Sequence, residues 1–429
     1  MNNVSDSSQT TSSEDAVGFM TAHQRDRLFL GSPLRRRGVA IGFAAVLVIL
    51  LAFAALTFAL LLGNMRPGGA GVFLRSLLAA SVFSLVPVAI LRWLDRRERE
   101  SPWVLAVAFL WGGLIATSLA LPLNSIILAK IDEWVSYSAL LQQMLGGEAV
   151  LMLGAPIAGP LVEEFTKGLG IVLFFFLLRA EYDNMRDGFI YGAMVGAGFN
   201  WFEAPLYVAQ GFAQFGDAPW ELQLGARFAL FGMAGHALFS GLFGAFLGLA
   251  RQTTTWWVRY GAPFLGLLLA IAAHMLNNLL PLAVTLVEAR AGKPPPAQAA
   301  PPPDVGLLEA WASVSLMNLV VFLPFVALIL FLLWRSGRWE RHVIQEELAS
   351  ERGDIVTADE YEQIERDRVF RTRRIVTEGR RQSAALVNAQ HELAFRKRRV
   401  RDRSGDPEAD PLVVGWREEI RKLRRDTWA

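Results

Sequence analysis

The chain has 429 residues, of which 53% are hydrophobic, and its 42 Lys and Arg against 40 Asp and Glu leave a formal net charge of +2. This near balance of charge argues against a nucleic-acid-binding protein, which needs a marked basic excess. No cysteine is present, so disulfides, thiol nucleophiles and thiolate zinc sites are excluded. The apolar residues lie in long runs, which favours a membrane protein over a soluble one.

The chain begins with a polar and then basic segment. Residues 1–37 are rich in Ser, Thr and charged residues, so we expect a disordered tail in the cytosol. No signal-peptide cleavage pattern precedes the first apolar run, which is therefore predicted to remain as a membrane anchor.

Eight apolar segments follow, each with the roughly 20 residues that a helical crossing of a bilayer needs. They cover about 39–63, 70–93, 103–129, 148–179, 189–210, 226–250, 260–286 and 307–334. We therefore predict an all-α fold, in which residues 38–334 form a polytopic bundle of about eight transmembrane helices in the cell membrane.

Arginines mark alternate ends of these segments and so indicate their orientation. They stand before the first segment and after the second, fourth, sixth and eighth, at Arg35–Arg37, Arg92–Arg99, Arg179–Arg186, Arg251–Arg259 and Arg335–Arg341. Because cytoplasmic loops carry the excess of basic residues, both chain termini are predicted to be cytoplasmic.

The last segments differ in character from the bundle. Residues 293–304, KPPPAQAAPPPD, predict an extended external loop between the seventh and eighth crossings. Residues 335–429 are highly charged, with apolar residues at helical spacing, and predict a helical cytosolic tail. Its charges are of mixed sign, so we expect solvated helices in contact with anionic lipid and no nucleic-acid partner.

A small set of ionisable and amide side chains falls deep within the apolar segments, where charge is costly. The candidate site residues are Glu163 and Glu164 on the fourth segment, Glu203 on the fifth, His236 on the sixth, and His274 with Asn278 on the seventh. At about 1.5 Å per residue, the carboxylates and histidines of these segments all fall about 21–23 Å from the cytoplasmic edge. Independent structural hydrogen bonds need not share one depth, whereas a single site requires it.

The surroundings of the two adjacent glutamates support a site. Pro160 is predicted to start a helix, which would place Glu163 and Glu164 in first turns that favour carboxylates. Lys167 is three or four residues further on and is interpreted as their charge partner. Arg227, near the membrane interface, is interpreted as a structural residue.

Four motifs stand in order on consecutive segments. They are PLVEEFTKGLGI with its EExxK pattern, MRDGFIYGAMVGAGFNWFEAPLY, RFALFGMAGHALFSGLFGAFLGLA, and IAAHMLNNLL with its HxxxN pattern. Together they resemble the PrsW family of intramembrane proteases, which is related to the CAAX-processing glutamic proteases. The resemblance covers about residues 148–290. It departs from the family at Glu203, which is followed by Ala204 instead of the usual Asn, and Asn200 is the candidate substitute.

The resemblance implies an intramembrane endopeptidase acting on membrane protein or peptide substrates. Glu163 would be the general base, His236 would position the water, and His274 with Asn278 would stabilise the oxyanion. Glu164 and Glu203 would orient these groups, and no cofactor is required. Two alternatives stay open at this point: a zinc-dependent protease with Glu163, Glu203, His236 and His274 as ligands, and a non-catalytic scaffold or proton-coupled transporter.

Overall fold

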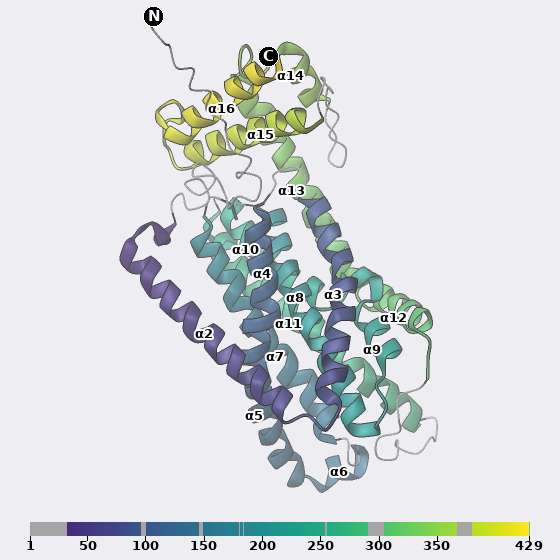
Figure 1. The fold of residues 1–429 in the computed structure, drawn as a ribbon. Helices are drawn as coiled ribbons and strands as arrows, with labels where there is room; N and C mark the ends of the chain where they lie inside the picture. The colour runs from purple at the N-terminus through teal and green to yellow at the C-terminus, as the bar shows by residue number, and fades with distance from the viewer. Residues whose placement is uncertain are drawn as a thin grey trace, which may run out of the picture.

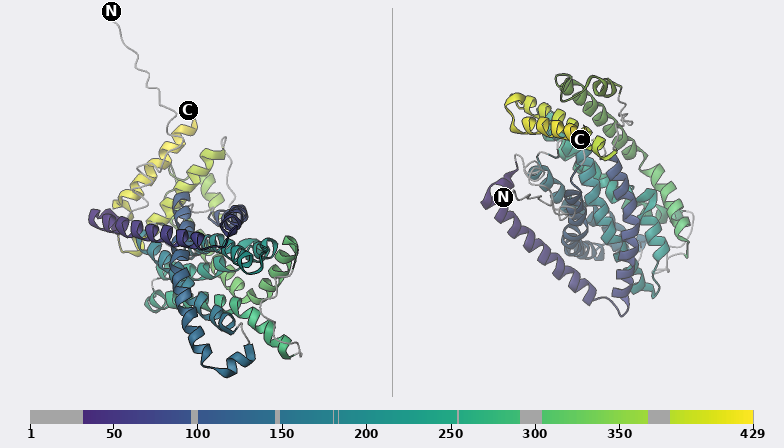
Figure 2. Two further views of the ribbon diagram at one scale, coloured as in Figure 1. Left: turned by 60° about the horizontal axis from the view of Figure 1, so that its bottom comes forward. Right: turned by 45° about the horizontal axis from the view of Figure 1, so that its top comes forward.

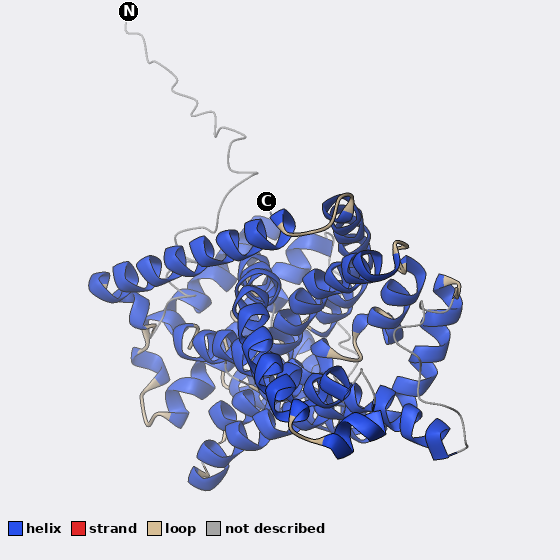
Figure 3. Ribbon diagram, turned by 90° about the horizontal axis from the view of Figure 1, so that it is seen from below, coloured by secondary structure: helices blue, strands red, loops and turns tan. Residues whose placement is uncertain are grey.

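A computed structural model of the chain gives an all-helical molecule (Figure 1). It describes residues 32–95, 100–145, 149–179, 181–182, 184–253, 255–290, 304–366 and 380–428. The predicted tail at 1–37 falls mostly outside these residues, and the proline-rich loop at 293–304 almost entirely so. No strand occurs in the part of the chain that is described, and Figure 3 accordingly draws its elements as blue helices joined by tan loops.

The first half of the chain supplies long, apolar helices. They are α2 (Arg37–Gly63), α3 (Gly69–Leu94), α4 (Pro102–Leu110), the π-helical turn η3 (Trp111–Ala116), α5 (Thr117–Ser136), α6 (Ala139–Leu145), α7 (Ala149–Leu177) and α8 (Met185–Phe215). Helix α4, η3 and α5 follow one another without a break and form one apolar helix of 35 residues. Helix α2 lies along the side of the bundle with its apolar side chains mostly exposed, as expected for a helix that faces lipid.

The second half completes the bundle and adds a further group of helices. The elements are α9 (Trp220–Arg227), η5 (Ala229–Gly232), α10 (His236–Gln252), α11 (Trp256–Arg290), α12 (Leu307–Val321), α13 (Leu323–Ala349), α14 (Ala358–Glu365), α15 (Arg380–Asp402), η6 (Pro407–Ala409) and α16 (Pro411–Trp428). Helices α14, α15 and α16 gather beyond one end of the bundle in Figure 1, and the right-hand view of Figure 2 draws them at the top of the molecule.

Helical structure occupies each of the eight predicted segments. Among the described residues, five helices are long and apolar enough to cross a membrane, and a sixth span is added if α12 and α13 count as one. Helices α7 and α8, of 29 and 31 residues, carry acidic residues near their centres. Two segments depart from a straight helix: α12 and α13 meet at an angle of 73°, and the sixth segment is interrupted before His236. The count of eight crossings stays a prediction.

Helix α8 is the central element of the bundle, because almost every side chain from Met185 to Pro205 is buried. It packs most extensively on α10, and the contact is close because glycines face backbone. A Cβ on Gly192 would lie 2.2 Å from the carbonyl oxygen of Ser240, and one on Gly196 would lie 2.1 Å from that of His236. Small residues at this interface let the two backbones approach directly.

Replacing Gly196 with Ala is therefore expected to separate α8 from α10 next to His236. Overpacking of a tight core costs about 1–3 kcal/mol, and the displaced histidine should also lose its carboxylate partner. Thermal unfolding and activity of the purified variant measure both effects. Gly42→Ala is the matched control, because a Cβ at Gly42 meets nothing within 4 Å. Equal stability of the two variants would contradict the packing described.

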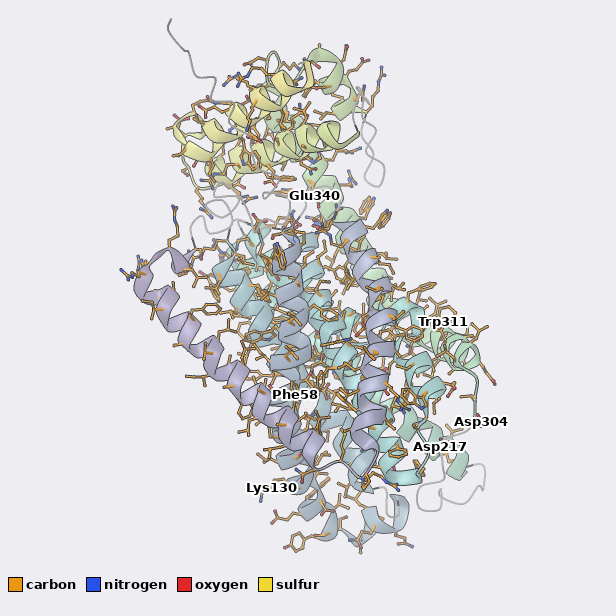
Figure 4. The ribbon with its side chains drawn as sticks, in the orientation of Figure 1. Phe58, Lys130, Asp217, Asp304, Trp311 and Glu340 are labelled. Atoms are coloured by element: carbon orange, nitrogen blue, oxygen red, sulfur yellow. The ribbon has the colours of Figure 1, made fainter. Side chains whose placement is uncertain are left out.

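The helices after the bundle enclose a hydrophobic core of their own. Its buried residues include Val343, Leu348, Leu393, Phe395 and Ile420, which come from α13, α15 and α16. Helix α13 is continuous between the bundle and this core, and Glu340 marks the level at which it leaves the bundle (Figure 4). The helices of the charged tail thus pack on one another around this core.

Glu351 is buried at the centre of an ionic cluster in this tail. Its carboxylate accepts from Lys397 at 2.5 Å and from Arg417 at 2.6 Å and 3.0 Å. Burial acts to raise the pKa of Glu351, but the hydrogen bonds from Arg417 and Lys397 outweigh it and hold the pKa below its ordinary value. The resulting stabilisation is present above the pKa of the unfolded chain, about 4.3, and is lost as pH falls through the lowered value.

We therefore expect the tail helices to lose amide protection when the pH falls below about 4. Hydrogen exchange of α15 and α16 in the intact, solubilised protein measures this, after correction for the intrinsic pH dependence of exchange. Glu351→Gln should lower protection at neutral pH by about 3 kcal/mol, because it leaves Lys397 buried without its anionic partner. Protection that is the same in wild type and variant would contradict this role.

Candidate active site

Glu163 and Glu164 lie in the middle of a long helix. The structure contradicts the prediction that Pro160 begins this helix: α7 starts at Ala149 and contains both Pro156 and Pro160. A helix packed among other helices tolerates proline because neighbouring donors can satisfy the freed carbonyls. The argument from a helix terminus therefore does not apply to these carboxylates, and their stabilisation comes from side chains of other helices.

Glu164 is the most heavily bonded carboxylate of the site. Its Oε1 lies 2.6 Å from Lys167 Nζ and 2.9 Å from His274 Nδ1, and its Oε2 accepts from Ser240 at 3.2 Å. Glu164 is 2% exposed and Lys167 is fully buried, so the two charges compensate each other away from solvent. Lys167 is thus a charge partner, as predicted, and its ion pair is formed with Glu164.

Lys167 also joins α7 to α10. Its Nζ lies 2.9 Å from His236 Nδ1 and 4.4 Å from the centre of the Phe199 ring. Since an ammonium group can only donate, His236 Nδ1 is the acceptor, and its Nε2 carries the proton. That Nε2 lies 2.6 Å from Glu203 Oε2. The tautomer of His236 thus follows from its two partners.

His236 stands at the start of a helix and not within one. The sixth segment was predicted to be helical from about residue 226, but α9 ends at Arg227 and α10 begins at His236. Between them, Leu230 and Phe231 adopt positive φ of 47° and 60°, and Gly235 has φ of 101°. Strained backbone of this kind persists only where its surroundings hold it in place. Here Ser315 Oγ accepts from the Leu230 N–H at 2.9 Å.

Glu203 contacts the ring nitrogen of His236 that is not bonded to Lys167. It forms an ion pair with Arg227, whose Nη1 also lies 3.4 Å from His236 Nε2 and whose guanidinium stacks over Tyr207 at 4.0 Å. Asn200, the proposed substitute for the family's Asn, donates to the backbone carbonyl of Arg227 at 3.0 Å. It therefore supports Arg227, which in turn supports Glu203.

Glu163 differs from the other carboxylates because one of its oxygens has no partner. It is 6% exposed; Oε1 accepts from Asn124 Nδ2 at 3.2 Å, and Oε2 is buried without a hydrogen bond. His274 Nε2 lies 3.9 Å from Oε2, which is too far for a direct hydrogen bond. Because His274 Nδ1 donates its N–H to the Glu164 carboxylate, its Nε2 carries no proton and is an acceptor facing Glu163.

Asn278 lies beside Glu163 but already has a backbone partner. Its Nδ2 donates to the carbonyl of Ala155 at 3.0 Å, and Asn277 donates to its Oδ1 at 3.0 Å. A Cβ on Gly159 would lie 3.2 Å from Asn278 Nδ2 and 3.3 Å from Glu163 Oε1, so both side chains border the same small space. One N–H of the Asn278 amide stays available to a ligand there.

The structure brings the predicted residues together and adds others. Glu163, Glu164, Glu203, His236 and His274 form one connected cluster, with Asn278 at its edge. The residues missed by sequence reasoning are Arg227, Asn124 and Ser240. Arg227 was taken as structural because it lies near the predicted segment end. Asn124 had a usable signal, as an amide within the apolar third segment.

Among the described residues, one group has the donors to hold a metal ion. This group consists of Glu163, His236 and His274. One ligand atom from each of them lies within 4.8 Å of the other two. Two imidazoles and a carboxylate are the ligands of many catalytic zinc sites, and both histidines have a second carboxylate partner that would orient them, so the donor set fits zinc. Glu203 is outside this group, and Lys167 occupies the remaining nitrogen of His236.

A buried carboxylate–histidine cluster inside a bundle of apolar helices marks a functional site within a membrane protein. A sequence model of the family described as PrsW family intramembrane metalloprotease matches residues 100–329. This is more than half of the chain and includes every candidate site residue, so the protein belongs to the PrsW family of intramembrane proteases. The resemblance noted from the four motifs is thereby confirmed. No curated protein and no solved structure matches the chain.

Proposed function

We propose that this protein is an endopeptidase of the cell membrane, with both termini in the cytoplasm, that hydrolyses peptide bonds of membrane-associated proteins or peptides. Glu163 is the general base. The observation that carries this assignment is the unpartnered Glu163 Oε2, buried and 3.9 Å from His274 Nε2. Every other carboxylate of the cluster is held by a cation or a histidine.

The proposed reaction uses a water molecule placed between these two acceptors. A water donating one hydrogen to Glu163 Oε2 and the other to His274 Nε2 directs its lone pair away from both. As the oxygen attacks the substrate carbonyl, its proton passes to Glu163. The tetrahedral intermediate then collapses, the C–N bond breaks, and Glu163 returns the proton to the departing nitrogen.

The other residues prepare the site for this step. His274 holds the water, a role that the sequence assigned to His236, because both nitrogens of His236 have partners. Asn278 offers its second N–H to the oxyanion. The Lys167 ammonium adds positive charge to the cluster through Glu164 and His236. Glu164 and Glu203 fix the ring orientations of His274 and His236.

A zinc-dependent protease is the second candidate, favoured by the three-donor group and by the family description. Glu163, His236 and His274 would hold the ion, with Glu164 and Glu203 orienting the two rings. Zinc would supply a Lewis acid that polarises water or the substrate carbonyl. His236 would then have to exchange its contact with Lys167 for the metal.

Metal removal separates the two candidates. We expect the purified protein to contain far less than one equivalent of zinc and to keep its activity after chelation and desalting. Elemental analysis and initial rates before and after chelation are the measurements. Loss of activity on chelation, restored by added zinc, would establish the metal-dependent version instead.

The function itself is tested with the full chain reconstituted in lipid nanodiscs. The probes are fluorescently labelled casein and a panel of single-span membrane proteins, with mass spectrometry of the product termini. We expect cleavage at internal bonds by the wild type. A scaffold or transporter would yield no new termini with any probe, and that outcome would overturn the proposal.

A further inference from the structure

Asn124 lies outside the four motifs, and its side-chain amide contacts Glu163, the proposed general base. It lies on α5, two residues after Pro122, and α5 packs against α7. The approach of these helices is close: a Cβ on Gly154 of α7 would lie 2.4 Å from Leu128 Cδ2 of α5. Since Leu128 is one turn from Asn124, this contact fixes the height of the amide beside Glu163.

The two polar side-chain atoms of Asn124 differ in their hydrogen bonding. Nδ2 donates to Glu163 Oε1 at 3.2 Å, whereas Oδ1 is buried and has no hydrogen-bond partner. An ionised carboxylate accepts only, so the amide nitrogen must face it and the oxygen must face away. The direction of the Asn124 side chain is therefore determined by Glu163.

Each of these two hydrogen-bonded side chains thus keeps one buried acceptor without a partner, Asn124 Oδ1 and Glu163 Oε2. Buried acceptors without partners are rare and costly, more so in a membrane interior. Two free acceptors on side chains that bond to each other are complementary to a ligand that presents two donors. A peptide group with its attacking water is such a ligand, because the amide supplies an N–H and the water supplies an O–H.

We propose that Asn124 is a further residue of the active site, which positions Glu163 through Nδ2 and accepts a backbone N–H of the substrate at Oδ1. The assignment of the ligand rests on the proposed peptidase function. Asn124 commits Glu163 Oε1 to a fixed hydrogen bond and leaves Oε2 as the oxygen that takes the proton. The ligand class is an extended peptide with a secondary amide next to the bond that is cleaved.

The link between Asn124 and Glu163 is tested without activity, by carbodiimide labelling. Hydrophobic carbodiimides react with protonated carboxyl groups, and tandem mass spectrometry locates the adduct at Glu163. Because Asn124 stabilises the ionised carboxylate, Asn124→Leu is expected to raise the pH of half-labelling by about one unit. Ser125→Ala, on the same helix, is the matched control. An unchanged half-labelling pH in Asn124→Leu would overturn the positioning role.

The contact with substrate is tested by removing the N–H from the ligand. Once a cleavage site is mapped, synthetic peptides spanning it are made with single N-methyl groups. At the position that pairs with Asn124, the wild type should lose about tenfold in kcat/KM, and Asn124→Leu should lose nothing further. Independent losses that multiply in the variant at every position would overturn the substrate contact.

These experiments distinguish a failure of the Asn124 role from a failure of the proposed peptidase function. A shifted half-labelling pH in a protein that cleaves no probe would retain the Asn124–Glu163 link and reject the peptidase function. Normal cleavage by Asn124→Leu, with an unshifted half-labelling pH, would retain the function and reject the role of Asn124.

Discussion

Glu163→Gln is expected to lower the rate of peptide-bond cleavage by about a thousandfold. Gln has nearly the same shape as Glu and can still accept the hydrogen bond from Asn124, but its amide cannot take a proton from water. The loss should therefore fall on kcat, with KM nearly unchanged, because ground-state contacts with the substrate are preserved. Initial rates of the reconstituted variant against a cleaved probe measure it.

Two controls define the meaning of that result. Glu133→Gln removes an exposed carboxylate of α5 that pairs with Lys130 at 2.8 Å, so its rate should match the wild type. Thermal unfolding of Glu163→Gln should occur at the wild-type temperature or above it, because the buried oxygen without a partner is no longer charged. A Glu163→Gln rate comparable to that of Glu133→Gln would reject Glu163 as the base.

Lys167→Met is expected to produce the largest loss of stability among the site variants, about 3–5 kcal/mol. Met fills the volume but leaves Glu164 buried with its charge uncompensated, although His274 and Ser240 still bond to it. It also removes the donor to His236 Nδ1. Denaturant or thermal unfolding of the solubilised protein measures the change.

A double variant tests whether charge compensation is the cause. Glu164→Gln combined with Lys167→Met removes both members of the buried pair and should recover much of the stability lost in Lys167→Met alone. If the losses of the two single variants simply add, the ion pair contributes nothing beyond packing. Lys130→Met, at an exposed ion pair, should change stability by less than about 1 kcal/mol.

The sequence predicts the broad features of the bundle because they depend on local composition. Long apolar runs need a helical conformation wherever the backbone cannot bond to water, so each predicted segment is mainly helical. The interruption before His236 depends instead on tertiary contacts. Leu230 and Phe231 have ordinary side chains, and their positive φ is sustained by the packing of α12, which lies far along the chain. No local pattern reports such a constraint.

The residues of the site could be predicted from the free-energy cost of placing charged groups in a membrane. The hydrogen bonds and ion pairs between them could not be predicted. Carboxylates and histidines deep in apolar segments are expensive enough to identify the residues. Which nitrogen of His236 meets Lys167, and which meets Glu203, depends on how α7, α8 and α10 rotate against one another. Arg227 and Asn124 enter the site through the same three-dimensional packing. The unpartnered oxygen of Glu163, from which its role is inferred, is visible only in the assembled structure.

The most direct test of the central claim, that Glu163 activates water for peptide-bond hydrolysis, is cleavage in oxygen-18-labelled water. Wild type, reconstituted with a cleaved probe, should place the heavy oxygen in the new carboxyl terminus, as read by mass spectrometry of the fragments. Glu163→Gln should yield almost no labelled fragment over the same time. Labelled fragments formed at the wild-type rate by Glu163→Gln, or fragments without label in the wild type, would contradict the account.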